Sequence, residues 1–224
     1  MELNADFAER VVINHHNLEW VTSPTPGVTR RMLERKGGEV ARATSIVRYA
    51  PGTHFPAHAH DFGEEILVLE GTLSDEHGDY PVGTYIMNPP GSFHAPFSEQ
   101  GCTLFVKLRH LGADQLVRER VDTNKAPWLQ GLVEGLHVMP LMRQGSGSTL
   151  VRWGPQTYFN PHRHFGGEEI FVVQGTFEDE HGTYPAGSWI RSPHMSLHRP
   201  FSREGCTIFV KTGHLHLPQS EARA

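Results

Sequence analysis

Cysteine is scarce in this sequence, which has two cysteines in 224 residues. Two thiols cannot build the disulfide framework of a small secreted domain, and their scarcity is typical of a reducing compartment, so we expect a cytoplasmic protein. Long apolar runs are also missing, since even Ile66–Leu69 is among the longest. A membrane-spanning helix needs roughly 20 apolar residues, so we expect no membrane span. The opening segment MELNADFAER has no basic stretch followed by an apolar one, and we expect no signal peptide.

Positive charge is in short supply as well. The chain has 20 Lys and Arg against 25 Asp and Glu, which gives a formal net charge of −5. Proteins that bind nucleic acid by neutralising phosphates usually carry a basic stripe, and this sequence has none, so we expect no nucleic-acid partner. Histidine, in contrast, is abundant, with 16 residues. That excess favours metal binding or acid–base chemistry.

The sequence contains an internal duplication. The segment Pro51–His110 aligns without a gap with Pro155–His214, and more than half of the aligned positions are identical. A match of this quality indicates two copies of one structural unit. We therefore expect two tandem domains, residues 1–112 and 113–224, which are joined within the polar segment Gly112–Lys125.

Each repeat has the pattern of an all-β domain. Short segments rich in Val, Ile, Phe, Tyr and Thr alternate with clusters of Gly, Pro, Asp and Asn, which is typical of strands and turns. In the first repeat the predicted strands are Ser45–Tyr49, Glu64–Leu69, Thr84–Asn88 and Thr103–Leu108. Helical periodicity occurs only weakly, at Gln115–Val121. The pattern predicts a sandwich or a small barrel in each repeat.

Four side chains in the first repeat form a candidate metal site. His58 and His60 are two residues apart, so in an extended chain they point the same way. Glu64 opens the next predicted strand, and His94 follows a Pro-Pro-Gly turn from which a neighbouring strand could return. The second repeat reproduces all four positions as His162, His164, Glu168 and His198.

Three imidazoles and one carboxylate suit a borderline divalent metal such as zinc, iron, manganese, nickel or copper. Glu65 and Glu169 are rival ligands, because each directly follows the chosen glutamate. They would face the opposite side of the strand, which favours Glu64 and Glu168. We therefore expect two divalent metal ions per chain.

Two spaced patterns enclose these residues. The first, G-x5-H-x-H-x3-E-x6-G, is formed by Gly52, His58, His60, Glu64 and Gly71. The second, G-x5-P-x-G-x2-H, is formed by Gly83, Pro89, Gly91 and His94. Together they resemble the two motifs of the cupin family, and the second repeat carries both again. The resemblance implies two double-stranded β-helix (jelly-roll) barrels, a bicupin, each with one metal ion on its three histidines and glutamate.

The second repeat departs from the motifs at two turns. Gln156 and Met195 stand where the pattern has glycine. Because glycine tolerates turn conformations that other residues resist, we expect a distorted second site or narrower access to it.

The blocks EEILVLEGTLSDEHGDYPVGTYIMNPPGSFHAPFS and GCTLFVK resemble the cupin domain of ChrR-type anti-sigma factors. That resemblance implies a regulatory or stress-sensing metal module in transcription control, with zinc as the first expected metal. In that family a preceding zinc domain with an HxxxCxxC motif grips the sigma factor. The motif is absent from this sequence, so sigma-factor binding is doubtful here.

Similar cupins also include metal-dependent dioxygenases. The alternative function is therefore a mononuclear iron, manganese or nickel enzyme that acts on a small carbonyl or carboxylate compound. No catalytic residue stands out beside the metal ligands. Arg191 replaces Met87 and, if it points inward, would give the second site a preference for an anionic ligand. Pairing of edge strands could also produce a homodimer.

Overall fold

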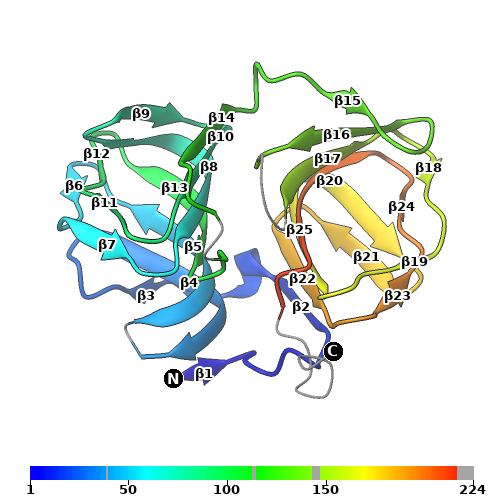
Figure 1. The fold of residues 1–224 in the computed structure, drawn as a ribbon, viewed down its shortest axis with the longest axis horizontal. Coiled ribbons are helices and arrows are strands. Elements are labelled where there is room, and N and C mark those ends of the chain that lie inside the picture. Colours follow the sequence, from blue (N-terminus) through cyan, green and yellow to red (C-terminus); the bar gives the residue numbers. More distant parts are fainter. Residues whose placement is uncertain (39, 113–114, 143–146, 216–224) are drawn as a thin grey trace. The chain divides into compact units, whose positions relative to one another are not determined.

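The computed structural model describes residues 1–38, 40–112, 115–142 and 147–215. In this part of the chain the regular elements are β strands and one short 3-10 helix, η1 (His15–Asn17), as Figure 1 shows. The expected all-β fold of two jelly-roll repeats is therefore confirmed. Among these residues no helix is long and apolar enough to cross a membrane.

The strands form two compact units whose segments alternate along the chain. Unit one contains residues 1–5 and 18–126, and unit two contains residues 6–17 and 127–224. The expected boundary between residues 112 and 113 separates the sequence repeats and stays a prediction for the domains.

Unit one holds one large antiparallel sheet that curls on itself, in the path order β1-β4-β5-β13-β8-β10-β14, and a two-stranded ribbon of β7 and β11. Its strands are β1 (Glu2–Leu3), β3 (Val21–Thr22), β4 (Val28–Gly37), β5 (Ala41–Tyr49), β6 (Thr53–His54), β7 (His58–His60), β8 (Glu64–Asp75), β9 (Gly78–Pro81), β10 (Thr84–Asn88), β11 (Ser92–His94), β12 (Phe97–Ser98), β13 (Cys102–Leu108) and β14 (Glu119–Asp122).

Unit two repeats this plan with the path order β15-β16-β17-β25-β20-β22-β2 and a ribbon of β19 and β23. Its strands are β2 (Val11–Asn14), β15 (Leu129–Gln130), β16 (Leu136–Pro140), β17 (Ser148–Trp153), β18 (Thr157–Tyr158), β19 (His162–Arg163), β20 (Glu168–Asp179), β21 (Gly182–Pro185), β22 (Ser188–Ser192), β23 (Leu197–His198), β24 (Phe201–Ser202) and β25 (Cys206–Thr212).

One predicted element is wrong. The weak helical pattern at Gln115–Val121 corresponds to no helix, and its second half belongs to β14, which pairs with β10. The open edge of β10 offers backbone hydrogen-bond partners to Glu119–Asp122, and this outweighs a weak local preference for helix there. The four strands predicted for the first repeat all lie within observed strands.

Alternation along β8 explains how the barrel interior is built. Ile66 and Val68 are buried in the core, and Glu64 lies two residues before Ile66 on the same face. The alternating residue Glu65 points to the other face, where it accepts a hydrogen bond of 2.8 Å from the Tyr85 hydroxyl. The carboxylate of Glu64 is thereby placed on the same face as the apolar core residues of β8.

The end of this stretch of β8 requires glycine. Gly71 has a φ of 69°, and a Cβ atom there would overlap the carbonyl oxygen of Gly101, the residue just before β13. The last position of the first motif is therefore a close backbone contact between two elements of the barrel wall. Gly175 repeats this arrangement against Gly205 in unit two.

Candidate metal centres

The histidine ribbon of unit one brings three imidazoles together. In the register of β7 and β11, His58 lies opposite His94, and His60 lies opposite Ser92. The three ring centroids are 4.7 to 5.0 Å apart. One ligand atom from each histidine and one from Glu64 all lie within 4.8 Å of one another. The structure therefore gathers the four side chains that the spacing predicts for site one.

Glu64 completes the group from β8. Its Oε2 atom lies 3.3 Å from His60 Nε2 and 3.5 Å from His94 Nε2. The same oxygen accepts a hydrogen bond of 2.9 Å from the Asn88 side chain, which lies opposite Glu64 in the register of β10. Asn88 in turn accepts a bond of 2.8 Å from Arg118. This chain of contacts fixes the carboxylate toward the histidines.

Asp75, at the end of β8, orients His94 from behind. His94 Nδ1 lies 3.1 Å from Asp75 Oδ2, and the Arg118 guanidinium donates to the same oxygen at 3.0 Å. The Tyr80 hydroxyl donates to Oδ1 at 2.7 Å. Burial would raise the pKa of Asp75, but the hydrogen bonds from His94 and Tyr80 lower it well below its usual value. An ionised Asp75 holds the proton on Nδ1 and leaves Nε2 of His94 as a metal-ligating lone pair.

The unsatisfied atoms of site one fit a divalent cation. His60 Nε2 and His94 Nε2 are buried and have no hydrogen-bond partner among the described residues. His58 uses Nδ1 for the Pro56 carbonyl oxygen at 2.9 Å, which also leaves its Nε2 free for a metal. Burial lowers the pKa of His60 although Glu64 opposes this, so the neutral, metal-binding form is favoured. Buried polar atoms without partners usually mark a missing ion or water.

Site two brings its three histidines as close together as site one does, but Glu168 does not lie within reach of all three. The nitrogen atoms of His162, His164 and His198 lie within 4.8 Å of one another. Glu168 approaches His164 Nε2 at 3.3 Å and His198 Nε2 at 3.6 Å. Burial, aided by neighbouring histidines, lowers the pKa of His164 to about 3 and that of His198 to about 4. Burial and the charge of Asp179 raise the pKa of Glu168 to about 8.

Fewer hydrogen bonds hold the candidate ligands of site two in place. Ser192 occupies the position of Asn88 opposite the ligand glutamate, and Glu168 Oε2 is buried without a hydrogen-bond partner in the described part of the chain. Arg10 donates to Asp179 at 3.0 Å, as Arg118 does to Asp75. The distance from Asp179 Oδ2 to the ligand histidine, His198, is 4.0 Å, too long for a hydrogen bond.

The two turns that lack glycine keep a glycine-like backbone. Gln156 and Met195 have φ values of 57° and 60°, close to the 72° of Gly52 and the 80° of Gly91. The turns of the second repeat therefore run as in the first, at the cost of left-handed conformations in residues that carry a Cβ atom. The two sites differ instead in the residues behind their ligands.

Two alternatives from the sequence are resolved by position. Glu169, the rival of Glu168, accepts a bond of 3.1 Å from Trp189 Nε1 on the other face of β20. Arg191 is wholly buried, donates to the carbonyl oxygens of Asp6 and Glu9, and is not among the residues that line the cavity of unit two. Its suggested role in anion preference is therefore wrong, because Arg191 also lies on the face away from the site.

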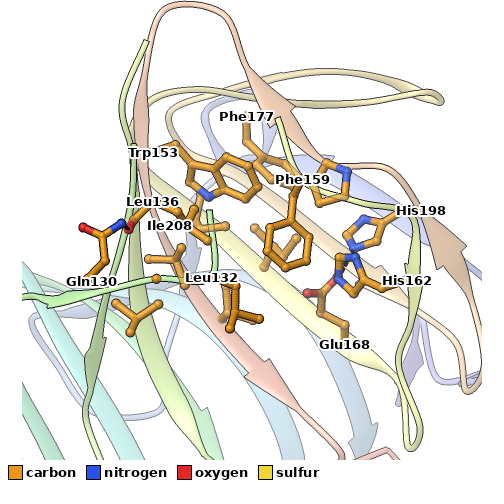
Figure 2. A pocket seen from close by; sticks show the side chains of 16 residues that line it. Gln130, Leu132, Leu136, Trp153, Phe159, His162, Glu168, Phe177, His198 and Ile208 are labelled. Carbon is orange, nitrogen blue, oxygen red and sulfur yellow. Dashed lines mark hydrogen bonds and ion pairs between the residues drawn. The ribbon is translucent and has the colours of Figure 1, made fainter. Parts of the chain in front are cut away.

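Each site opens on a cavity inside its own barrel. The cavity of unit one has a volume of about 510 Å³ and reaches all four candidate ligands. Apart from the candidate ligands, three arginines, among them Arg30 and Arg35, line it against one acidic residue, Asp61. The cavity of unit two, shown in Figure 2, has a volume of about 320 Å³ and an apolar wall that His162, Glu168 and His198 interrupt at one end.

Sequence reasoning missed the supporting residues and one cavity residue. Asp75 and Asp179 occupy equivalent positions in the two repeats, at the start of a recurring DEHG block, and that recurrence was a usable signal. No sequence signal marked Asn88 and Arg118, since their partners are distant in the sequence. Trp153, which belongs to neither spaced motif, lines the cavity of unit two.

Known structures with a similar fold include enzymes and metal-binding proteins. A candidate dioxygenase from Nostoc punctiforme superposes with a TM-score of 0.74 at 15% identity, covering 95% of this chain and 88% of that one. A bacterial pirin from Escherichia coli, in complex with nickel(II), gives 0.66 at 13% identity, with 93% and 100% covered. Oxalate decarboxylase from Lactobacillus farciminis, in complex with formate, gives 0.63 at 13% identity, with 92% and 86% covered. At these identities the likeness concerns the fold alone.

Comparison of the sequence with family models and curated proteins identifies the family. None of the curated proteins matches the chain. The family model of the ChrR cupin-like domain matches it twice, over residues 8–112 and 117–216, and thus spans both repeats. With the histidines and the glutamate of both motifs present in each repeat of a double cupin fold, the chain belongs to the ChrR cupin-like domain family.

Proposed function

We propose that the protein is a metal-dependent enzyme of the dioxygenase type that acts on a small carbonyl or carboxylate compound. The observation that carries this proposal is the union of a four-residue ligand cluster with a cavity of about 510 Å³ in unit one. A structural metal site needs no such space, whereas a catalytic site keeps coordination positions open toward its substrate.

A divalent metal bound there would act as a Lewis acid and as a template for substrate oxygen atoms. His58, His60, Glu64 and His94 would hold it. Since His58 is the most accessible of the four and lines the cavity, the open side of the cluster faces the substrate space. Arg30 and Arg35 place positive charge on the same wall, where they would attract and orient a carboxylate.

The family favours a second function, a regulatory or stress-sensing metal module. The match to the ChrR cupin-like domain over both repeats supports it. In that case zinc, closed off by four protein ligands, would occupy the sites. Iron, manganese or nickel with exchangeable waters would favour the enzyme instead.

The test compares metals and measures turnover. The metal-free protein would be loaded with iron(II), manganese(II), nickel(II) or zinc(II), and oxygen uptake would be followed with small 1,3-diketones and 2-oxo acids. We expect uptake with a redox-active metal, and its loss in His60→Ala. A protein that is purified with zinc alone and consumes no oxygen with any of these metals would contradict the enzyme and favour the sensory module.

A further inference from the structure

The cavity of unit two differs in character from that of unit one. Its wall consists of aliphatic and aromatic side chains, among them Phe159, Phe177 and Ile208 in Figure 2. Its ionisable members are confined to His162, Glu168 and His198, and no Lys or Arg lines it among the described residues. A ligand that fills this space must therefore be mainly apolar.

Two polar side chains interrupt the apolar wall, and the amide nitrogen of one of them, Gln130, is already bonded to backbone carbonyl oxygens. Trp153 is 5% exposed, and its indole Nε1 has no hydrogen-bond acceptor among the described residues. The other buried tryptophan, Trp189, donates its Nε1 to Glu169 at 3.1 Å. A buried N–H without an acceptor costs free energy that an acceptor within the cavity would recover. Trp153 thus marks where a ligand acceptor atom would sit.

Aromatic rings connect this donor to the candidate metal ligands. The Trp153 ring lies 6.4 Å from Phe159 and 5.8 Å from Phe177, measured between centroids. Phe159 in turn lies 5.0 Å from the His162 ring, and Phe177 lies 6.5 Å from the His198 ring. One end of the cavity therefore offers a hydrogen-bond donor and the other end the histidines, with an aromatic wall between them.

The strand register shows what changed between the repeats. Leu136 pairs with Trp153 and Val138 with Val151 in unit two, where unit one pairs Val28 with Tyr49 and Arg30 with Val47. Val138 therefore takes the place of Arg30, and Trp153 that of Tyr49. The substitution removes a cation from the wall, so the second cavity has lost a group that would offset the charge of an anionic ligand.

We propose that the cavity of unit two binds a small, uncharged, ring-bearing molecule whose carbonyl oxygen accepts a hydrogen bond from Trp153 Nε1. This inference deepens the function proposed above, on which it rests for the role of the site, by naming the ligand class of the second repeat. Trp153 acts in it as a binding and specificity-determining residue.

The test uses acetophenone as the probe and the full-length, zinc-loaded protein. Four tryptophans give separable indole N–H signals in a proton–nitrogen NMR spectrum, and Trp153→Phe identifies the signal of Trp153. We expect acetophenone to shift that signal downfield in a saturable titration. α-Methylstyrene, which replaces C=O with C=CH₂, should bind about fivefold more weakly to the wild type, as expected for the loss of one neutral hydrogen bond. Benzoate should compete poorly at this signal.

Two variants complete the experiment. Trp153→Phe keeps an aromatic ring without the donor, and it should reduce acetophenone affinity about fivefold without changing that of α-methylstyrene. The matched control Tyr49→Phe, at the equivalent position of unit one, should leave the Trp153 titration unchanged. If Trp153→Phe does not fold, the comparison of the two ligands on the wild type decides. A Trp153 signal that saturating acetophenone leaves unmoved, or equal affinities for the two ligands, would overturn the proposal.

Repeating the titration after chelation separates this inference from the proposed function. A Trp153 shift that persists in a protein without oxygen uptake would support the ligand class and count against the enzyme. Metal in both sites, with oxygen uptake but no Trp153 shift, would overturn the ligand class alone.

Discussion

The Arg118 guanidinium lies 3.0 Å from Asp75 Oδ2, and through this contact it supports a metal site that it does not touch. Asp75 orients His94, while a second nitrogen of Arg118 holds Asn88, which donates to Glu64. One arginine from the segment before β14 therefore lies behind two of the four candidate ligands of site one. Residues behind the ligands commonly change metal affinity by about 10- to 100-fold.

We predict that Arg118→Met weakens metal binding at site one by at least about tenfold. The variant removes the guanidinium that donates to Asp75 and to Asn88, while its side chain retains similar bulk. Arg10→Met is the matched variant at site two, where the arginine bonds to Asp179 but to no amide behind the glutamate, so its effect should be smaller. Competition with a chromogenic chelator measures both affinities. Equal losses in the two variants would show that the Asn88 connection is unimportant.

Site two should release a proton when it binds metal near neutral pH. Burial raises the pKa of Glu168 to about 8, so the metal-free carboxyl is mostly protonated at pH 7, and a metal must displace that proton. The pKa values of His164 and His198, about 3 and 4, leave both imidazoles without a proton to release at this pH. Affinity should therefore rise with pH up to about 8 and then level off. His60→Ala disables site one, so metal binding in this variant reports on site two alone. Calorimetric titration in buffers of different ionisation enthalpy should find close to one proton released per metal ion at pH 7 and almost none at pH 9.

The raised pKa of Glu168 also determines how the stability of the metal-free protein changes with pH. Because the folded-state pKa of Glu168 lies above its ordinary value of 4.5, this group stabilises the metal-free fold at low pH and loses that contribution as pH rises toward about 8. A proton count that stays constant from pH 7 to pH 9 would contradict the raised pKa.

Exchanging the residue opposite the ligand glutamate should raise the metal affinity of site two and lower that of site one. Ser192→Asn gives Glu168 the amide donor that Glu64 receives from Asn88, which should lower the pKa of Glu168 and strengthen metal binding at pH 7. The reciprocal Asn88→Ser should weaken site one. Titration of each variant with a metal, against the wild type, measures the exchange. The idea fails if Ser192→Asn leaves both the affinity and the proton release of site two unchanged.

The left-handed turn at Met195 should be a source of strain. A residue with a Cβ atom in this region costs about 1 kcal/mol or more, so Met195→Gly should raise the free energy of unfolding of the metal-free protein by about 1 kcal/mol. Gly91→Ala is the control, since the equivalent turn has a φ of 80° and no atom within 4 Å of an added Cβ, and it should lose a similar amount. Urea unfolding measures both. A destabilised Met195→Gly would mean that the methionine side chain contributes packing that outweighs the strain.

Local patterns were sufficient to predict most of the fold and the ligand cluster. His58 and His60 share a face of one strand, and Glu64 opens the next, so short-range alternation fixed three of the four directions before any tertiary contact was known. Because the second repeat has the same residues at the same spacing, the same alternation predicted the directions of its ligands in unit two. The strand β14 was not predicted, because its pairing with the open edge of β10 cannot be inferred from the residue pattern of the segment itself.

The features that distinguish the two sites depend on partners far apart in the sequence. Arg118 meets Asp75 across 43 residues. Trp153 is an ordinary strand residue in the sequence, and only the barrel shows that its Nε1 is buried beside a cavity. Arg191 looked like a cavity residue until the pairing of β2 with β22 covered it. A pattern read along one chain reveals periodicity but not which distant side chain completes a hydrogen bond.

Metal content tests the central claim most directly. Elemental analysis of the purified, metal-saturated protein should give about two divalent ions per chain. His60→Ala and His164→Ala should each reduce this to about one, and the double variant to about none, with a lower melting temperature at every step because metal binding favours the folded state. A wild type that takes up no metal, or single variants that keep the full content, would contradict the account.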